Sequence, residues 1–393
     1  MSSALIYKMR LTAPNKPGTA SHNSNYVKYI AEREHVMKLS PESESGLFGR
    51  IDGTNNDELD VTDTQNYVYG ISKAGVTVYN AYISFRPEIA KRLELDSLEK
   101  WQNYIKFHIE TLMRGYDIPK DRFEYIAAVH DKKGQPHIHI SFWDKDPPVT
   151  VQFVKKEVSD NVRKKLIHDT FANELSYYYG ISNEAMSDAK ELVGKLMIDF
   201  ERDISGIYSN RFSGVDISEE LIQWYTDVLS NLPGRGRIAY AYLPKETKDM
   251  VIGMIKEMIM LPKMKSIIND YYSGARSAAE MFDSKETDNG KSEIDRKMRK
   301  AAGDLYNRLG NIILKSMLRT LKENNEQRKK DNAEINTQMT VDSVIYALNA
   351  MSRLFRTQGS AGTVNTAHAL IGELSKQAKK DIARQKQDKG YEV

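Results

Sequence analysis

The stretch "RFEYIAAVHDKKGQPHIHISFW", residues 122–143, consists of two strand-like segments joined by a short polar connection. Its two halves are rich in β-branched and aromatic residues, and Gly134 and Pro136 lie between them, which is typical of a β-hairpin. Side chains alternate across a strand, so His137 and His139 are expected to share one face. The isoleucines and phenylalanine between and after them then line the opposite face, which is the natural core side.

His130 ends the first of these two segments, seven residues before His137. Folding the hairpin brings it beside the other two histidines on the same sheet face. Three neutral imidazoles that converge from adjacent strands form a metal site with open coordination positions. The alternative is a set of surface histidines on an exposed sheet. A single His-x-His arises often by chance, but a third histidine across the hairpin favours a metal site.

The rest of the N-terminal part predicts strands and helices in mixed order. Residues 3–11 and 75–85 have the composition of strands. Residues 24–36 have helical spacing after a possible cap at Ser24, and an amphipathic helix is expected to begin at the cap Ser97. Residues 40–66 are rich in Ser, Gly, Asn and Asp, which predicts a long loop.

From about residue 151 onward, prolines are rare and apolar residues follow a heptad-like spacing. The expected fold class is therefore α+β. A catalytic core over residues 1–150 is built on a central, mainly antiparallel sheet with flanking helices, and a mainly helical region follows over residues 151–393. The boundary is expected near Pro147 and Pro148.

The composition narrows the function only slightly. The chain has 393 residues, 28% of them charged, and a net charge of +3. It contains no stretch of about twenty apolar residues, so no membrane insertion is expected. The absence of cysteine excludes disulfides and thiolate metal sites, and it suits a reducing cytoplasm, where we expect the protein to act.

A metal site held by three histidines is compatible with two reactions. A metal-bound hydroxide can hydrolyse a substrate, or the ion can polarise a phosphodiester for attack by a protein nucleophile. The second reaction needs a side chain that attacks phosphorus, and the chain offers 22 tyrosines and no cysteine. The residues alone leave both reactions open.

Several stretches resemble a known family. "VHDKKGQPHIHISF" is similar to the histidine motif of the conjugative relaxases of the HUH endonuclease superfamily, and "NYVKYIAERE" resembles the motif that carries their nucleophilic tyrosine. In relaxases the tyrosine precedes the histidines, as it does here. The resemblance is closest to the MobL group and extends to about Lys248. It is carried by five segments in the same order, the first of which overlaps the tyrosine motif: "KYIAEREHV", "SGLFG", "ISFRPEIAKRL", "HIETL" and "GRIAYAYLPKETKD".

This resemblance implies an HUH-type sheet and a defined chemistry. Tyr29 attacks the scissile phosphate at an origin of transfer, leaving a 5′-phosphotyrosyl adduct and a free 3′-hydroxyl. A divalent ion, Mg²⁺ or Mn²⁺, is held by His130, His137 and His139 and stabilises the developing charge. The DNA around the nick is expected to be single-stranded or extruded, since a phosphate in a paired duplex reaches a recessed site poorly.

Other nucleophiles remain as alternatives. Tyr26 lies one helical turn before Tyr29, so both can point to one face. The cluster Tyr177–Tyr179 would serve if the chain had the order of a rolling-circle replication initiator, with the nucleophile after the histidines. His22 is a further alternative, because some relaxases use a histidine near the N-terminus.

Two residues are expected to contact DNA. Arg86 follows the strand at 75–85 and is placed to meet a phosphate, although a solvated helix start explains it equally well. Trp143 shares the histidine face and is expected to stack on an unpaired base, with a packing role as the alternative. Asp131 is interpreted as a carboxylate of the turn rather than as a hydrogen-bond acceptor that orients a metal-binding histidine.

Three rival functions remain at this point: a replication initiator with the same metal site, a His-ligated metal hydrolase, and a binding protein whose site has decayed. The helical region is expected to bind DNA, a conjugation coupling protein, an accessory DNA-binding protein or a second copy of the chain, and the sequence favours none of these partners.

Overall fold

The hairpin predicted at residues 122–143 forms the centre of a six-stranded antiparallel sheet in this computed structural model. The structure describes residues 3–132, 134–208, 219–232, 237–283 and 292–330. The strand order is β1-β4-β6-β5-β2-β3. The strands are β1 (Leu5–Leu11), β2 (Phe48–Ile51), β3 (Thr54–Asn56), β4 (Tyr79–Phe85), β5 (Phe123–Lys132) and β6 (Gln135–Asp144).

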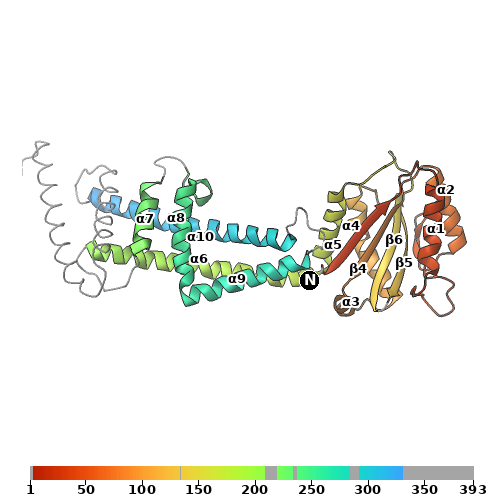
Figure 1. Ribbon diagram of the computed structural model, residues 1–393, viewed down its shortest axis with the longest axis horizontal. Coiled ribbons are helices and arrows are strands. Elements are labelled where there is room, and N and C mark those ends of the chain that lie inside the picture. Colours follow the sequence, from red (N-terminus) through yellow and green to blue (C-terminus); the bar gives the residue numbers. More distant parts are fainter. Residues whose placement is uncertain (1–2, 133, 209–218, 233–236, 284–291, 331–393) are drawn as a thin grey trace, which may run out of the picture. The chain divides into compact units, whose positions relative to one another are not determined.

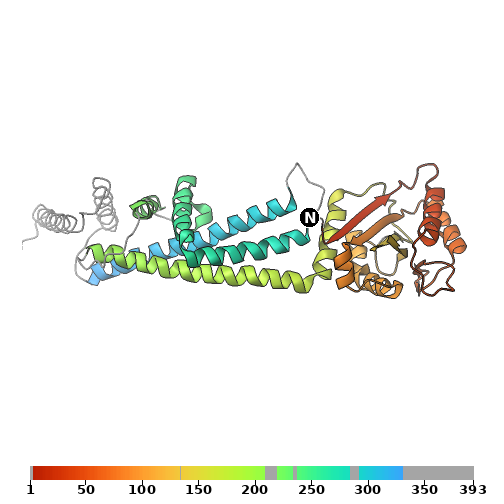
Figure 2. The same cartoon turned by 60° about the horizontal axis from the view of Figure 1, so that its bottom comes forward.

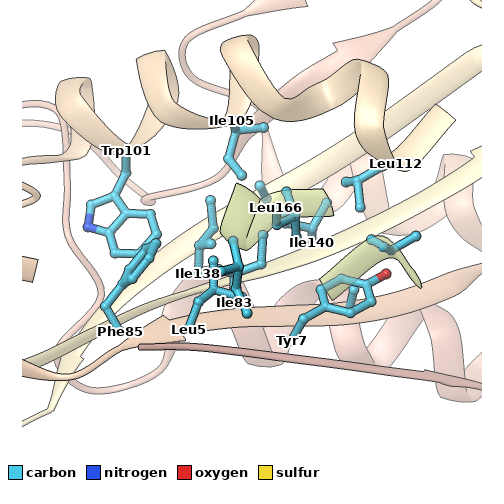
Figure 3. Packing of buried hydrophobic residues seen from close by; sticks show 14 of the residues in the cluster. Leu5, Tyr7, Ile83, Phe85, Trp101, Ile105, Leu112, Ile138, Ile140 and Leu166 are labelled. Atoms are coloured by element: carbon cyan, nitrogen blue, oxygen red, sulfur yellow. The ribbon is translucent and has the colours of Figure 1, made fainter. Parts of the chain in front are cut away.

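One face of this sheet packs against α4 (Leu98–Gly115) and α5 (Lys156–Thr170) (Figure 1). Ser97 begins α4 as predicted, because its hydroxyl accepts a hydrogen bond from the backbone N–H of Lys100. Figure 3 shows the core on this face. It includes Leu5, Ile83, Ile138, Ile140, Trp101, Ile105 and Leu112, all of them buried. Each such aliphatic side chain contributes about 1.5–3 kcal/mol on burial.

The opposite face carries the histidines and is covered in part by α1 (Thr19–Glu32) and α2 (Val61–Lys73) (Figure 1). A second apolar cluster lies beneath these helices and includes Val27, Ile30, Ala31, Val68, Ile126, Ala128 and Trp143. Helix α1 begins five residues before the predicted cap Ser24, after Gly18 at φ 83. The side chain of Gly18 is a hydrogen, which permits this left-handed backbone.

The prediction of a long loop at residues 40–66 was wrong. This segment contains β2, β3 and the first turns of α2. Asp52 (φ 51) and Gly53 (φ 75) form a tight turn between β2 and β3, and Asp-Gly is a favoured pair for such hairpins. Asp60 begins α2 by accepting a hydrogen bond from the N–H of Asp63. Both signals were present in a segment whose polarity suggested a loop.

A buried carboxylate holds these peripheral elements on the sheet. Glu124 of β5 is 1% exposed and accepts three hydrogen bonds. They come from the phenol of Tyr67 (2.7 Å), the indole N–H of Trp143 (3.0 Å) and the backbone N–H of Asp52 (2.8 Å). Glu124 thereby joins β5 and β6 to α2 and to the β2–β3 turn.

We expect Glu124→Gln to lower the free energy of unfolding by about 1–3 kcal/mol, because one acceptor oxygen becomes a donor that faces N–H groups. Urea unfolding followed by circular dichroism measures this change. Glu110→Gln is the matched control, since Glu110 forms only an exposed ion pair with Arg114 on α4; a change within about 0.5 kcal/mol is expected there. Equal midpoints for both variants would contradict the role of Glu124.

The remaining described elements are helical, and all but the first of them lie after residue 151, where a mainly helical region was predicted. They are α3 (Pro87–Arg92), α6 (Ala172–Tyr208), α7 (Glu219–Ser230), the short 3₁₀ helix η1 (Tyr240–Tyr242), α8 (Lys245–Met260), α9 (Pro262–Met281) and α10 (Glu293–Lys330). Figure 2 shows α6, α9 and α10 running alongside one another. A separate apolar cluster, which includes Val193, Val251, Met254 and Leu309, lies among the long helices.

By internal contacts, the described residues form two units. The first comprises residues up to 180 together with 274–298, and the second comprises residues 181–273 and those from 299 on. The division into a catalytic core over 1–150 and a helical region over 151–393 stays a prediction, and its last part, residues 331–393, lies outside the described residues. None of the helices described is long and apolar enough to cross a membrane.

Candidate metal and nucleophile site

The pairing register places the three histidines together on one sheet face. His130 pairs directly with His137, and His139 follows two residues later on the same strand. The ring centroids of the three imidazoles lie 4.9–5.5 Å apart. The convergence predicted from the hairpin is therefore present in the structure.

Hydrogen bonds determine which ring nitrogens remain available. Nε2 of His130 donates to the carbonyl of Ile30 on α1 (2.8 Å), and Nδ1 of His137 donates to the carbonyl of Gln135 (3.0 Å). Nδ1 of His130 and Nε2 of His139 are buried and have no hydrogen-bond partner in the part of the chain that the structure describes. One nitrogen from each imidazole lies within 4.8 Å of the others. Three imidazole lone pairs in this arrangement fit a divalent ion and leave its other positions open.

Burial favours the neutral form of two of the imidazoles, those of His130 and His139, and the neutral form is the one that binds a metal. Burial, together with the neighbouring His130, His137 and Arg33, lowers the pKa of His139 to about 3. Burial likewise lowers the pKa of His130, although the hydrogen bond to Ile30 opposes this shift.

Tyr26 on α1 contacts the Nδ1 edge of the His139 imidazole. Its hydroxyl lies 2.9 Å from Nδ1 of His139. If Nε2 of that ring, which has no hydrogen-bond partner among the described residues, binds an ion, then Nδ1 carries the proton and donates it to the phenolic oxygen. Burial and the adjacent Tyr29 raise the pKa of Tyr26 to about 12, while Arg10 acts in the opposite direction. Tyr26 is thus a hydrogen-bond partner of His139, and a contact of this kind fixes the orientation and tautomer of a histidine when it binds a metal.

Tyr29 lies one turn further along α1 and is 45% exposed. Its ring stacks on Tyr26 (5.9 Å between centroids) and meets His139 edge-on (6.4 Å). Nη1 of Arg33 donates a hydrogen bond to the Tyr29 oxygen, and the guanidinium carbon lies 4.9 Å from the ring centroid. The exposed Tyr29 side chain therefore lies next to His139, and its oxygen lies beside a positive charge that stabilises developing negative charge on it.

The structure corrects the prediction for Trp143. Alternation placed it correctly on the histidine face, but Trp143 is 0% exposed and its indole N–H donates to Glu124. Helices α1 and α2 cover that end of the face, so stacking on an unpaired base, as predicted, is wrong for this residue. Arg86 begins α3 and forms an ion pair with Glu88 (3.4 Å), and its contact with DNA stays a prediction.

The alternative nucleophiles lie elsewhere. His22 is an exposed residue of α1 and does not belong to the histidine cluster. Tyr178 packs against the core on the opposite face of the sheet, and its neighbours Tyr177 and Tyr179 are exposed on α6. Asp131 follows His130 and does not belong to the group of three histidines that could hold an ion among the described residues.

Sequence reasoning missed Arg33 and Tyr82. Arg33 stands four residues after Tyr29, a spacing that puts both on one helix face, so the signal was available. Tyr82 pairs with His139 across β4 and β6, and its ring lies 6.0 Å from the rings of both His137 and His139. Only the pairing register could have revealed that neighbour.

The family model for MobL relaxases matches residues 12–363, which is most of the chain. Neither the curated proteins nor the solved structures contain a match.

Proposed function

This chain belongs to the MobL relaxase family, and from that premise we propose that it nicks one strand of DNA at an origin of transfer by tyrosine transesterification. The observation that carries this proposal is the position of Tyr29. Tyr29 is 45% exposed, its phenolic oxygen lies beside Arg33, and its ring contacts one of three histidines that fit a divalent ion.

In the proposed reaction the Tyr29 oxygen attacks the scissile phosphorus. The bond from this oxygen to phosphorus forms while the bond from phosphorus to the 3′ oxygen breaks. The phenol proton passes to solvent, and the departing 3′ oxygen takes a proton from solvent. The products are a 5′-phosphotyrosyl adduct and a free 3′-hydroxyl. Since the number of phosphoester bonds is unchanged, the hydroxyl can later reverse the step and rejoin the strand.

The chain's own residues have separate tasks in this scheme. His130, His137 and His139 would hold Mg²⁺ or Mn²⁺, which when bound polarises the phosphate and stabilises its added charge. Arg33 stabilises negative charge on the Tyr29 oxygen. Tyr26 orients His139, because its oxygen lies at Nδ1, on the opposite edge of the ring from the nitrogen left for the metal.

Tyr26→Phe tests this separation of roles. We expect its affinity for Mn²⁺ to fall about 10- to 100-fold, the usual effect of removing an outer partner of a metal ligand. At saturating Mn²⁺ the variant should still form the DNA adduct, because Tyr29 is intact. Titration calorimetry measures the affinity and a denaturing gel detects the adduct. Unchanged Mn²⁺ affinity together with loss of the adduct would make Tyr26 the nucleophile.

The substrate and the partners follow from the same proposal. We infer that the DNA is single-stranded or extruded around the nick, that the protein works in the cytoplasm to start mobilisation of a plasmid or other mobile element, and that a conjugation coupling protein or an accessory DNA-binding protein cooperates with it. The replication-initiator alternative is disfavoured by Tyr178, which packs on the other face of the sheet.

A plasmid assay tests the proposal as a whole. Supercoiled plasmid carrying the element's origin region is incubated with the full chain and Mn²⁺. Open-circular DNA with protein bound after denaturation is the expected product, and a chelator should prevent its formation. If protein that binds Mn²⁺ nicks no plasmid carrying any segment of the origin region, the proposal fails. A metal hydrolase then becomes the better explanation.

A further inference from the structure

The sheet face that carries the histidines is open beyond them. The register aligns side chains in rows across β1, β4 and β6: Lys8, Tyr82 and His139 form one row. Helices α1 and α2 cover the end of this face over β5. On the other side of β6, Lys8 is exposed and Tyr82 is half-buried. The open part of this sheet face, from the histidines toward β1, thus presents the aromatic ring of Tyr82 and the positive charge of Lys8.

The open part of the sheet face contains a hollow of about 370 Å³ beside the three histidines. Its lining consists of Tyr82, Ser84, Lys132, Gln135 and His137. The volume lies within the range of pockets for small ligands, about 300–1,000 Å³. One lining residue is also a histidine of the metal site, so a group in the hollow lies next to whatever the ion binds.

We propose that this hollow binds the base of the nucleotide on the 5′ side of the scissile phosphate, with the Tyr82 ring as its stacking surface. This inference rests on the proposed function. In a displacement at phosphorus, the attacking and leaving oxygens lie roughly in line. Tyr29 approaches β6 from α1, which packs over β5, whereas Tyr82 lies on β4, the neighbour of β6 on the other side. The leaving 3′ oxygen and its nucleotide therefore depart toward Tyr82.

The chemistry of the lining fits a nucleotide. An aromatic ring stacks on any base, and a positive groove follows the phosphates of a single strand. The Ser84 hydroxyl and the Gln135 amide offer donors and acceptors to a base edge. Within the described ranges, neither Lys8 nor Lys132 has an ion-pair partner, so both ammonium groups are available to phosphates.

Binding in the presence of EDTA tests the hollow without nicking. The probes are a fluorescein-labelled single-stranded 20-mer of mixed sequence and an abasic backbone of the same length. For Tyr82→Ala we expect affinity for the 20-mer to fall about 5- to 100-fold, the usual effect of losing a stacking side chain, with little change for the abasic strand. Tyr82→Phe keeps the ring and should bind like the wild type. Tyr69→Ala, which removes an exposed tyrosine of α2, is the control.

The outcomes separate this inference from the proposed function. If Tyr82→Ala weakens both probes equally or neither, the hollow does not bind a base, whether or not the protein nicks DNA. Once the nick is mapped, a single abasic position on its 5′ side should remove the difference between wild type and Tyr82→Ala. If an abasic position on the 3′ side removed this difference instead, the assignment of the hollow to the 5′ nucleotide would be overturned. If Tyr82→Ala weakens binding of the 20-mer but not of the abasic strand, and the protein nicks no DNA, then the hollow binds a base but not beside a scissile phosphate. That result would overturn the placement of the base and the proposed function together.

Discussion

Tyr29→Phe is expected to abolish the covalent DNA adduct while leaving the fold and the metal site intact. Phenylalanine keeps the ring that stacks on Tyr26 and contacts His139, and it removes only the oxygen that attacks phosphorus. Loss of a covalent nucleophile lowers turnover by several orders of magnitude, on the order of 10⁶ in well-studied hydrolases. The measurement is the yield of protein-linked oligonucleotide on a denaturing gel, at saturating Mn²⁺.

Tyr69→Phe is the matched control for this variant. Tyr69 lies on the neighbouring helix α2 and is 41% exposed, close to the 45% of Tyr29. Its variant should form as much adduct as the wild type. If the Tyr29→Phe variant still forms the adduct, and the adduct disappears only in the double variant that also carries Tyr26→Phe, then Tyr26 is the nucleophile. The assignment of Tyr29 would then be wrong.

His137→Ala is expected to lower the affinity for Mn²⁺ by about 100-fold or more, since loss of a ligand costs more than loss of an outer partner, whose removal costs about 10- to 100-fold. His137 is half-buried, and among the described residues its Nδ1 bonds one group, the carbonyl of Gln135, so the fold should tolerate the change. Titration calorimetry with Mn²⁺ gives the affinity, and adduct formation should fall in parallel.

His22→Ala separates a ligand effect from the loss of an arbitrary imidazole. His22 is exposed on α1 and lies outside the histidine cluster. This variant should bind Mn²⁺ as the wild type does. Equal Mn²⁺ affinity in His137→Ala and the wild type would mean that the three histidines do not form the metal site.

The hairpin and its histidine face could be predicted because both depend on local rules. Alternation along β6 fixed which side chains share a face, and the short turn with Gly134 brought His130 opposite His137. The segment at residues 40–66 was misjudged because its polarity outweighed a turn signal only two residues long. Local composition cannot show that Glu124, from a distant strand, holds that segment on the sheet.

The error at Trp143 has a different origin. Alternation gave the correct face, but whether a face is exposed depends on the helices that pack over it. Ile126 and Ala128 lie on the same face as His130, and these apolar side chains indicated that part of the face is covered. The covered and open parts of one face cannot be told apart without the positions of α1 and α2.

The two tyrosines show where sequence reasoning stops. Their spacing of three residues correctly predicted that both point to one side of α1, and the structure adds that both rings lie next to that of His139. Their separate roles depend on single atoms, because the Tyr26 oxygen meets Nδ1 of His139 while the Tyr29 oxygen meets Arg33. Such a distinction requires coordinates.

Identification of the residue that becomes linked to DNA tests the central claim most directly. The full chain is incubated with single-stranded oligonucleotides that tile the element's origin region, in Mn²⁺ and in chelator, and the DNA-linked peptide is mapped by mass spectrometry. The account predicts a metal-dependent adduct on Tyr29. An adduct on Tyr177–Tyr179, or no adduct from protein that binds Mn²⁺, would contradict it.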